Sequence, residues 1–250
     1  WLYVCRAEEL PEPGNFVVKT IHGTGVEALI THTKAGRIQA FYNSCPHRGS
    51  IVVKESAGKA SRFSCPYHRW TFENTGDLVG VPDEENFFPS MDKKNCGLAK
   101  IATDVWEGWV FINLSPTPEV SLEDYLGPAK EYLGGILYRG AHNPVVYTAV
   151  LDANWKTASD AFIESYHIPH IHKKTIGTTF ASRLNPYSRL IGARPLGTHR
   201  TISLFGNPEY TIDPRNRVEA LGSMGQEGKS VIAADVSEEA TRFRAHPAIN

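Results

Sequence analysis

Two short segments that pair a cysteine with a histidine, CPHRG at residues 45–49 and CPYHRW at residues 65–70, decide the fold of this chain. Each segment offers one soft thiolate and one imidazole. A two-iron cluster that is held by two cysteines on one iron and two histidines on the other requires this set of ligands. The four candidate ligands are Cys45, His47, Cys65 and His68.

Zinc is the alternative occupant, because tetrahedral Zn²⁺ also takes two cysteines and two histidines. Zinc-finger spacing, however, pairs cysteine with cysteine and histidine with histidine, whereas each segment here carries one of each. This arrangement favours the iron–sulfur interpretation. The other two cysteines, Cys5 and Cys96, lie far away in sequence and are expected to be small buried apolar residues.

The composition excludes several broad classes of protein. Lys plus Arg (26) and Asp plus Glu (27) leave a formal net charge of −1, which gives no basic footprint for nucleic acid or for an anionic membrane surface. No apolar run reaches the roughly 18 residues that cross a bilayer, and the richest segment, 105–114, is interrupted by Glu107. We therefore expect a soluble protein with no nucleic-acid or membrane partner.

The chain is organised as a β-rich part followed by a different second part. Short apolar segments bounded by Gly, Pro, Asn or Ser predict strands at 2–4, 16–18, 28–30, 38–41, 50–53 and 108–112. Pro116 and Pro118 then mark a break, after which a helix is expected from Ser121 to about residue 133, and a strand at 145–151. We therefore place one domain at 1–115 and a second at 116–250.

A second group of potential metal ligands lies in residues 154–172, which read NWKTASDAFIESYHIPHIH. In a continuous helix Asp160, Glu164 and His167 would fall within about 60° of one another, on one face. A proline two residues after His167 should bend or stop that helix and bring His172 toward the same point. Two histidines with one carboxylate form the facial triad of non-haem Fe(II) oxygenases. The alternative is histidines that only interact with a helix dipole.

Together, the two groups resemble the motifs of the catalytic α subunit of Rieske non-haem iron oxygenases, the aromatic ring-hydroxylating type. The resemblance rests on the two cluster segments with 17 residues (48–64) between them, on 76–82, 106–111 and 154–156, and on the Glu164-x-x-His167-x4-His172 motif. It implies an α+β protein, in which an all-β Rieske [2Fe–2S] domain precedes the first part of a helix-on-antiparallel-sheet catalytic domain of the START/Bet v 1-like type.

The resemblance also implies roles for the second group. His167 and His172 would bind the mononuclear Fe(II), while His170 holds a position that the family does not use. Asp160 and Glu164 are the candidate catalytic carboxylates, and Glu164 matches the residue that links this iron to the cluster of a neighbouring subunit. The family's third iron ligand is an Asp far downstream. Only 78 residues follow His172, so we expect that ligand beyond residue 250 and the chain to be a fragment.

The implied activity is that of a terminal oxygenase in a bacterial cytoplasm. Electrons from NADH would arrive through a ferredoxin, a flavin reductase or both, and a homotrimer (α3) or an α3β3 assembly would hydroxylate a small apolar ring compound with O2. Cis-dihydroxylation, monooxygenation and demethylation all remain open, as does a Rieske ferredoxin-like electron carrier with a degenerate second domain. Candidate residues of a substrate pocket are Phe162, Phe180, Leu184, Leu190 and Phe205.

Overall fold

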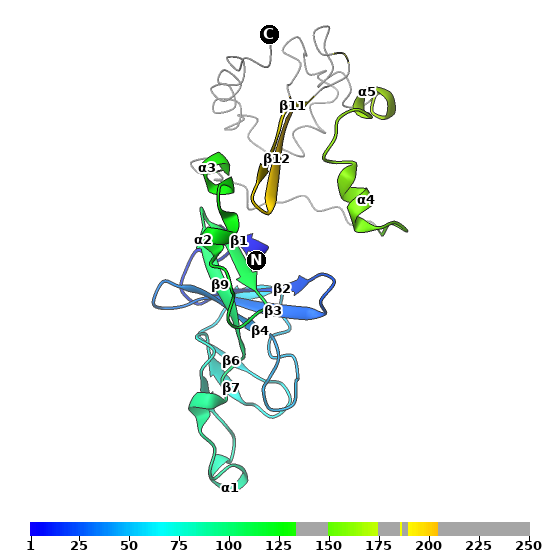
Figure 1. Cartoon of the computed structure of the whole chain (residues 1–250). Helices are drawn as coiled ribbons and strands as arrows, with labels where there is room; N and C mark the ends of the chain where they lie inside the picture. Colours follow the sequence, from blue (N-terminus) through cyan, green and yellow to red (C-terminus); the bar gives the residue numbers. More distant parts are fainter. Residues whose placement is uncertain (134–149, 175–185, 187–189, 205–250) are drawn as a thin grey trace. The chain divides into compact units, whose positions relative to one another are not determined.

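The computed structural model describes residues 1–133, 150–174, 186 and 190–204 (Figure 1). The chain divides into two compact units, Trp1–Tyr125 and Leu126–Asn250. The domain boundary that we predict after residue 115 stays a prediction. Among the described helices, none has the length and apolar character needed to cross a membrane.

Unit 1 is built on a seven-stranded antiparallel sheet. Its strands lie in the order β1-β10-β9-β4-β3-β2-β5, so that the two ends of the unit's sequence pair with each other through β1 and β10. The strands are β1 (Leu2–Arg6), β2 (Asn15–Ile21), β3 (Val26–His32), β4 (Ile38–Tyr42), β5 (Ala57–Lys59), β9 (Lys100–Trp106) and β10 (Trp109–Asn113).

A smaller three-stranded sheet carries the second cysteine–histidine segment. It consists of β6 (Arg62–Ser64), β7 (Thr71–Glu73) and β8 (Leu78–Gly80), all antiparallel, and the segment 65–70 is the connection from β6 to β7. The chain then makes an excursion that contains α1 (Glu84–Phe87) and the short 3₁₀ helix η2 (Lys93–Asn95) before it enters β9. In Figure 1, β6, β7 and α1 lie together at one end of unit 1. A further 3₁₀ turn, η1 (Ala7–Glu9), follows β1.

Two apolar clusters form the core of unit 1. One contains Cys5 and lies within the large sheet, and the other surrounds both candidate cysteine ligands with residues such as Phe41 and Phe72. Cys5 is buried, as predicted, and burial raises the pKa of its thiol to about 12. Cys96 is only partly buried and packs against the second cluster.

Five of the six strands predicted for this unit are confirmed, although most are longer than predicted. The strand predicted at 50–53 is wrong, because the side-chain amide of Asn43 forms hydrogen bonds with both the N–H and the C=O of Val53. Val52 and Val53 are nevertheless buried, in the cluster around the cysteines. The strands β5 to β9 are absent from the prediction. Strands β5 to β8 have three residues each, which are too few to show a period of two.

Unit 1 ends within its last helix, and unit 2 contributes further short helices and a hairpin. The helix predicted over 121–133 is divided into α2 (Leu122–Leu126) and α3 (Ala129–Leu133), with Gly127 at φ 47° between them. Further elements are α4 (Trp155–Asp160), α5 (Ile168–Ile171) and the antiparallel strands β11 (Leu190–Leu196) and β12 (His199–Leu204). Most of the strand predicted at 145–151 lies outside the described residues, and Val150 and Leu151 are not in a strand. The predicted α+β class is confirmed.

Candidate metal centres

The first cysteine–histidine segment forms a closed turn directly after β4. The amide of Cys45 donates to the carbonyl of Ser50 at 2.8 Å, and the amide of Gly49 donates back to the carbonyl of Cys45 at 2.8 Å. Gly49 has a left-handed backbone (φ 71°), which glycine adopts without steric cost. The turn therefore projects the side chains of Cys45 and His47 from a fixed frame.

The second segment repeats this backbone pattern. The amide of Cys65 donates to the carbonyl of Trp70 (2.8 Å), and the amide of Arg69 donates to the carbonyl of Cys65 (3.0 Å). Arg69 takes the position of the glycine in the first turn, with φ 60°. A left-handed backbone costs a residue with a side chain about 1–2 kcal/mol. Gly49 and Arg69 each lie four residues after the cysteine of their segment.

The two turns bring all four candidate ligands together. The thiols of Cys45 and Cys65 are buried and lie within hydrogen-bonding reach of each other. The rings of His47 and His68 are half-buried, with centroids 4.6 Å apart and planes inclined at 62°. The structure thus places two sulfurs inside and two imidazoles toward the surface of one site.

Hydrogen-bond donors surround the cysteine sulfurs. Burial raises the pKa of Cys65, but the backbone amides of Tyr67 and His68 and the side chains of Cys45 and Ser50 outweigh it, so the pKa is lowered overall. These donors favour a thiolate at Cys65, and hydrogen bonds to sulfur are one of the features that set the potential of an iron–sulfur cluster.

Cys45 and His47 respond mainly to burial. Burial raises the pKa of the Cys45 thiol, although the amides of His47 and Arg48 act in the opposite direction. Burial also lowers the pKa of His47, and the nearby His68 and Arg48 add to that effect. A neutral imidazole is the form that binds a metal.

The donor set fits a [2Fe–2S] cluster. It supplies two thiolates and two imidazoles on two matched turns, with amide donors beside the sulfurs. In the described parts of the chain, no three His, Cys, Asp or Glu side chains converge on a single point. A two-iron cluster does not require such a group, because each iron takes only two protein ligands.

In unit 2, the helix predicted to run through His167 ends at Asp160. Asn154 caps the start of α4, since its side chain accepts from the amide of Lys156 at 2.9 Å. After Asp160, the Glu164 carboxylate accepts from the amides of Tyr166 (2.5 Å) and His167 (3.3 Å). A side chain that takes these amides competes with the helical hydrogen bonds they would otherwise make.

The shared helix face predicted for Asp160, Glu164 and His167 is therefore wrong. Asp160 lies at the end of α4, and its backbone carbonyl accepts from the amide of Ile163 at 3.2 Å. Among the described contacts, none joins the Asp160 carboxylate to Glu164 or His167. The structure does not bring Asp160 into the second candidate centre.

The prediction that Pro169 bends or stops a helix that runs through His167 is wrong, because α5 begins just before this proline. It lies in the first turn of α5, where the missing N–H has no helical partner to lose. The amide of Ile171 donates to the carbonyl of His167 (2.8 Å), and that of His172 donates to the carbonyl of Ile168 (3.1 Å). This single turn sets the spacing between the two histidines.

By this route the structure places His167 beside both Glu164 and His172. The rings of His167 and His172 have centroids 5.3 Å apart at 63°. The Glu164 carboxylate contacts Nδ1 of His167, and this hydrogen bond holds the pKa of Glu164 below its ordinary value. His170 instead packs near Tyr166, with ring centroids 6.4 Å apart.

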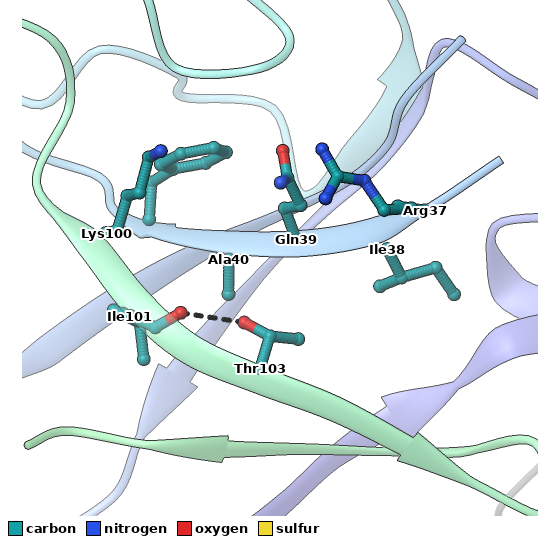
Figure 2. A pocket seen from close by; sticks show the side chains of 8 residues that line it. Arg37, Ile38, Gln39, Ala40, Lys100, Ile101 and Thr103 are labelled. Atoms are coloured by element: carbon teal, nitrogen blue, oxygen red, sulfur yellow. Dashed lines mark hydrogen bonds between the residues drawn. The ribbon is translucent and has the colours of Figure 1, made fainter. Parts of the chain in front are cut away.

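Neither the cavity between β4 and β9 nor the predicted pocket residues add to these centres. Figure 2 shows a cavity of about 190 Å³ where β4 and β9 diverge, in which the Thr103 hydroxyl donates to the Ile101 carbonyl at 2.8 Å. Its lining contains none of the candidate ligands. Phe162 is 83% exposed, and the side chains of Phe180, Leu184, Leu190 and Phe205 lie outside the described part.

Two family profiles match the chain. One, described as the Rieske [2Fe-2S] domain, matches residues 1–101, and the other, described as the ring hydroxylating alpha subunit (catalytic domain), matches residues 137–243. The first match contains all four candidate cluster ligands, and the second contains Glu164, His167 and His172.

Curated relatives and solved structures agree with the two profiles. The chain is 35% identical over 185 residues to 2-aminobenzenesulfonate 2,3-dioxygenase subunit alpha of an Alcaligenes species, which covers 72% of this chain and 46% of the relative. It is 31% identical over 219 residues to the anthranilate 1,2-dioxygenase large subunit of Burkholderia cepacia, with 82% and 49% covered.

Among solved structures, naphthalene 1,2-dioxygenase from a Rhodococcus species, bound to indole, is 32% identical with a TM-score of 0.68, and the match covers 88% of this chain and 52% of that one. The chain thus spans about half the length of these relatives. The paired turns and the histidine–glutamate group agree with these matches. The chain belongs to the family of Rieske ring-hydroxylating oxygenase alpha subunits.

Proposed function

We propose that the complete protein containing this chain is the terminal oxygenase of a multicomponent system. It uses O2 and electrons from NADH, delivered through a ferredoxin or a flavin reductase, to hydroxylate an aromatic or other apolar ring compound. The observation that carries the proposal is the presence of two ligand groups in one chain, one of cysteines with histidines and one of histidines with a carboxylate.

In this proposal the paired turns would hold the [2Fe–2S] cluster through Cys45, His47, Cys65 and His68. His167 and His172 would hold a mononuclear Fe(II) together with a carboxylate. When bound, the cluster supplies one-electron transfer and the mononuclear iron supplies O2 activation beside the substrate.

Glu164 orients one of these histidines. With Nδ1–H of His167 donating to the Glu164 carboxylate, Nε2 is left unprotonated and free to bind a metal. The carboxylate is also exposed, with its side chain at 45%, so it remains open to a further donor beside the amides of Tyr166 and His167. We propose His68 of a neighbouring subunit as that donor, in an α3 or α3β3 assembly.

The alternative of a ferredoxin-like carrier with a degenerate second domain is less well supported. A carrier needs one redox centre, whereas residues 137–243 match the catalytic domain of ring-hydroxylating alpha subunits. The relatives named above are dioxygenase subunits whose names refer to 2-aminobenzenesulfonate, anthranilate and naphthalene. These three compounds are therefore the first substrates to try.

The test is O2 uptake by the complete protein, supplied with NADH, a reductase and a ferredoxin. We expect uptake that depends on one of the aromatic compounds, and a hydroxylated product in a fixed ratio to the O2 consumed. Separation of diols from phenols would distinguish dihydroxylation from monooxygenation. Electron acceptance by the cluster without any substrate-dependent uptake, across aromatic and alicyclic compounds, would favour the carrier.

A further inference from the structure

The two candidate histidine ligands of the cluster have different surroundings. Trp70 stacks face to face on His47, with ring centroids 4.8 Å apart and planes only 6° from parallel. His68 instead lies against Tyr67, at 3.9 Å and 32°, and Tyr67 is 59% exposed. One imidazole is thus held against a buried indole, while the other lies beside a residue that is open to solvent.

A further aromatic ring, that of Phe88, contacts His47. The ring of Phe88 stands perpendicular to His47 (5.9 Å, 88°) and also perpendicular to Trp70 (5.5 Å, 86°). Edge-to-face contacts of this kind are favoured by the quadrupoles of aromatic rings. Trp70 is only 5% exposed, and Phe88 packs as a partly buried residue against the same core.

Phe88 reaches this position from the excursion between β8 and β9. Its amide donates to the carbonyl of Glu84 (2.8 Å), and its carbonyl accepts from the amide of Met91 (3.1 Å). An ion pair between Lys93 and Glu84 (2.8 Å) ties the two ends of this stretch together. The ring of Phe88 is therefore placed by a locally braced segment that contributes no candidate ligand of its own.

We propose that Phe88 is a positioning residue of the [2Fe–2S] site. Its ring holds the Trp70–His47 stack in place and keeps water from that side of the cluster, whereas the His68 side stays accessible for electron exchange. The proposal rests on the ligand set assigned above and adds to it a residue that neither binds metal nor belongs to either ligand segment.

The electrostatic consequence has a definite sign. Two thiolates and two sulfides balance two Fe³⁺, so the oxidised cluster is about neutral and the reduced cluster carries one added negative charge. Water near the site stabilises the charged form, and solvent exposure is one of the features that set cluster potentials. Loss of the Phe88 ring should therefore shift the midpoint potential upward.

The experiment compares Phe88→Leu and Phe88→Tyr with two matched controls in the complete, cluster-loaded protein. Phe87→Leu changes the neighbouring residue, which is 72% exposed and whose one described ring contact is with Phe88 itself. Phe63→Leu changes a buried ring (5% exposed) of the same core, which packs edge-on against Phe16 at 5.3 Å. The readouts are midpoint potential, electron paramagnetic resonance of the reduced cluster, the rate of cluster loss to a chelator, and thermal unfolding.

We expect Phe88→Leu to raise the midpoint potential, to shift the resonance lines and to speed cluster loss several-fold. Phe88→Tyr keeps an aromatic ring and should behave like the wild type. Phe87→Leu should change none of these, and Phe63→Leu should lower only the unfolding temperature. Phe88→Leu with an unchanged potential and spectrum, or with changes that Phe63→Leu reproduces, would overturn the inference. Zinc without sulfide in the wild type would instead overturn the ligand set beneath it.

Discussion

At the scale of single residues, Asn43 shows how one buried side chain replaces a stretch of sheet beside the first ligand turn. It is 3% exposed, its Oδ1 accepts from the amide of Val53 at 2.9 Å, and its Nδ2 donates to the carbonyl of Val53 at 2.7 Å. Sequence reasoning predicted a strand at 50–53 because the valines are apolar. An amide side chain that pairs with a backbone ten residues away leaves no periodic signal.

We predict that Asn43→Ala lowers the free energy of unfolding by about 2–4 kcal/mol, since an unpaired buried backbone group costs roughly 1–3 kcal/mol and Val53 would have two. Urea unfolding measures the change. Asn86→Ala is the control, because its amide hydrogen bond to Asp83 is exposed, and it should cost less than about 0.5 kcal/mol. Equal losses of unfolding free energy in the two variants would show that the buried hydrogen bonds of Asn43 contribute no more to stability than the exposed one.

Glu164 is the second residue whose role is local and testable. Glu164→Gln keeps its size but removes the negative charge that His167 contacts and that we propose to link two subunits. We expect normal reduction of the cluster in the complete protein and a large loss of product in a single turnover, measured with both metals at full occupancy.

The matched variant for this prediction is Asp160→Asn, which changes a carboxylate at the end of α4. Because the structure does not bring Asp160 to the histidines, its replacement should leave turnover within about twofold of the wild type. Unaltered turnover in Glu164→Gln would show that Glu164 is an ordinary solvated carboxylate with no part in electron transfer.

At the scale of elements, the ligand residues were predictable and the backbone that carries them was only partly so. Cysteine and histidine spacing is written directly in the sequence, and the structure brings together all four residues of the first group. The helix predicted over 154–167 is interrupted because the Glu164 carboxylate accepts hydrogen bonds from the amides of Tyr166 and His167. Helical periodicity shows which residues would share a face. It does not detect a side chain that competes for the backbone amides of the helix.

The hairpin between β9 and β10 offers a test of element geometry. Glu107 (φ 48°) and Gly108 (φ 75°) both have left-handed backbones, as a tight two-residue turn between antiparallel strands requires. A Cβ added at Gly108 would lie 2.7 Å from Nη2 of Arg6, whose guanidinium donates to the Glu107 carbonyl at 2.9 Å. Arg6 is 2% exposed and has little room to move.

We therefore predict that Gly108→Ala destabilises unit 1 by about 2–4 kcal/mol, measured by urea unfolding. Gly23→Ala isolates the backbone contribution, because Gly23 has φ 78° but nothing within 4 Å of an added Cβ. It should cost only about 1 kcal/mol. If the two alanines cost the same, the contact with Arg6 contributes nothing and the backbone conformation accounts for the whole effect.

At the scale of the whole molecule, the motifs predicted two groups of metal ligands and the family resemblance implied an α+β chain, but neither predicted how the sheet is ordered. The pairing of β1 with β10 joins residues about a hundred positions apart, and β2 lies between β3 and β5. Neither follows from local patterns, because strand order depends on which apolar faces meet in three dimensions. The family resemblance implied the fold class and left this strand order open.

The separation of the two ligand groups between unit 1 and unit 2 leads to the last prediction. Cys45, His47, Cys65 and His68 all belong to unit 1, whereas His167 and His172 belong to unit 2. Metal binding stabilises the structure that holds the ligands, so loss of one metal should affect chiefly its own unit. His167→Ala or His172→Ala in the complete protein should abolish product formation and leave the spectrum and the potential of the cluster unchanged.

Cys65→Ser is the reciprocal variant, because it should remove the cluster and lower the unfolding temperature while Fe(II) still binds to the mononuclear site. Metal analysis, labile sulfide and spectra of each variant measure the two centres independently. Since the proposed electron transfer joins the centres of neighbouring subunits, mixed oligomers of His167→Ala and Cys65→Ser chains should regain part of the activity that each variant lacks alone. Loss of both metals from every variant would show instead that the two groups stabilise one common structure.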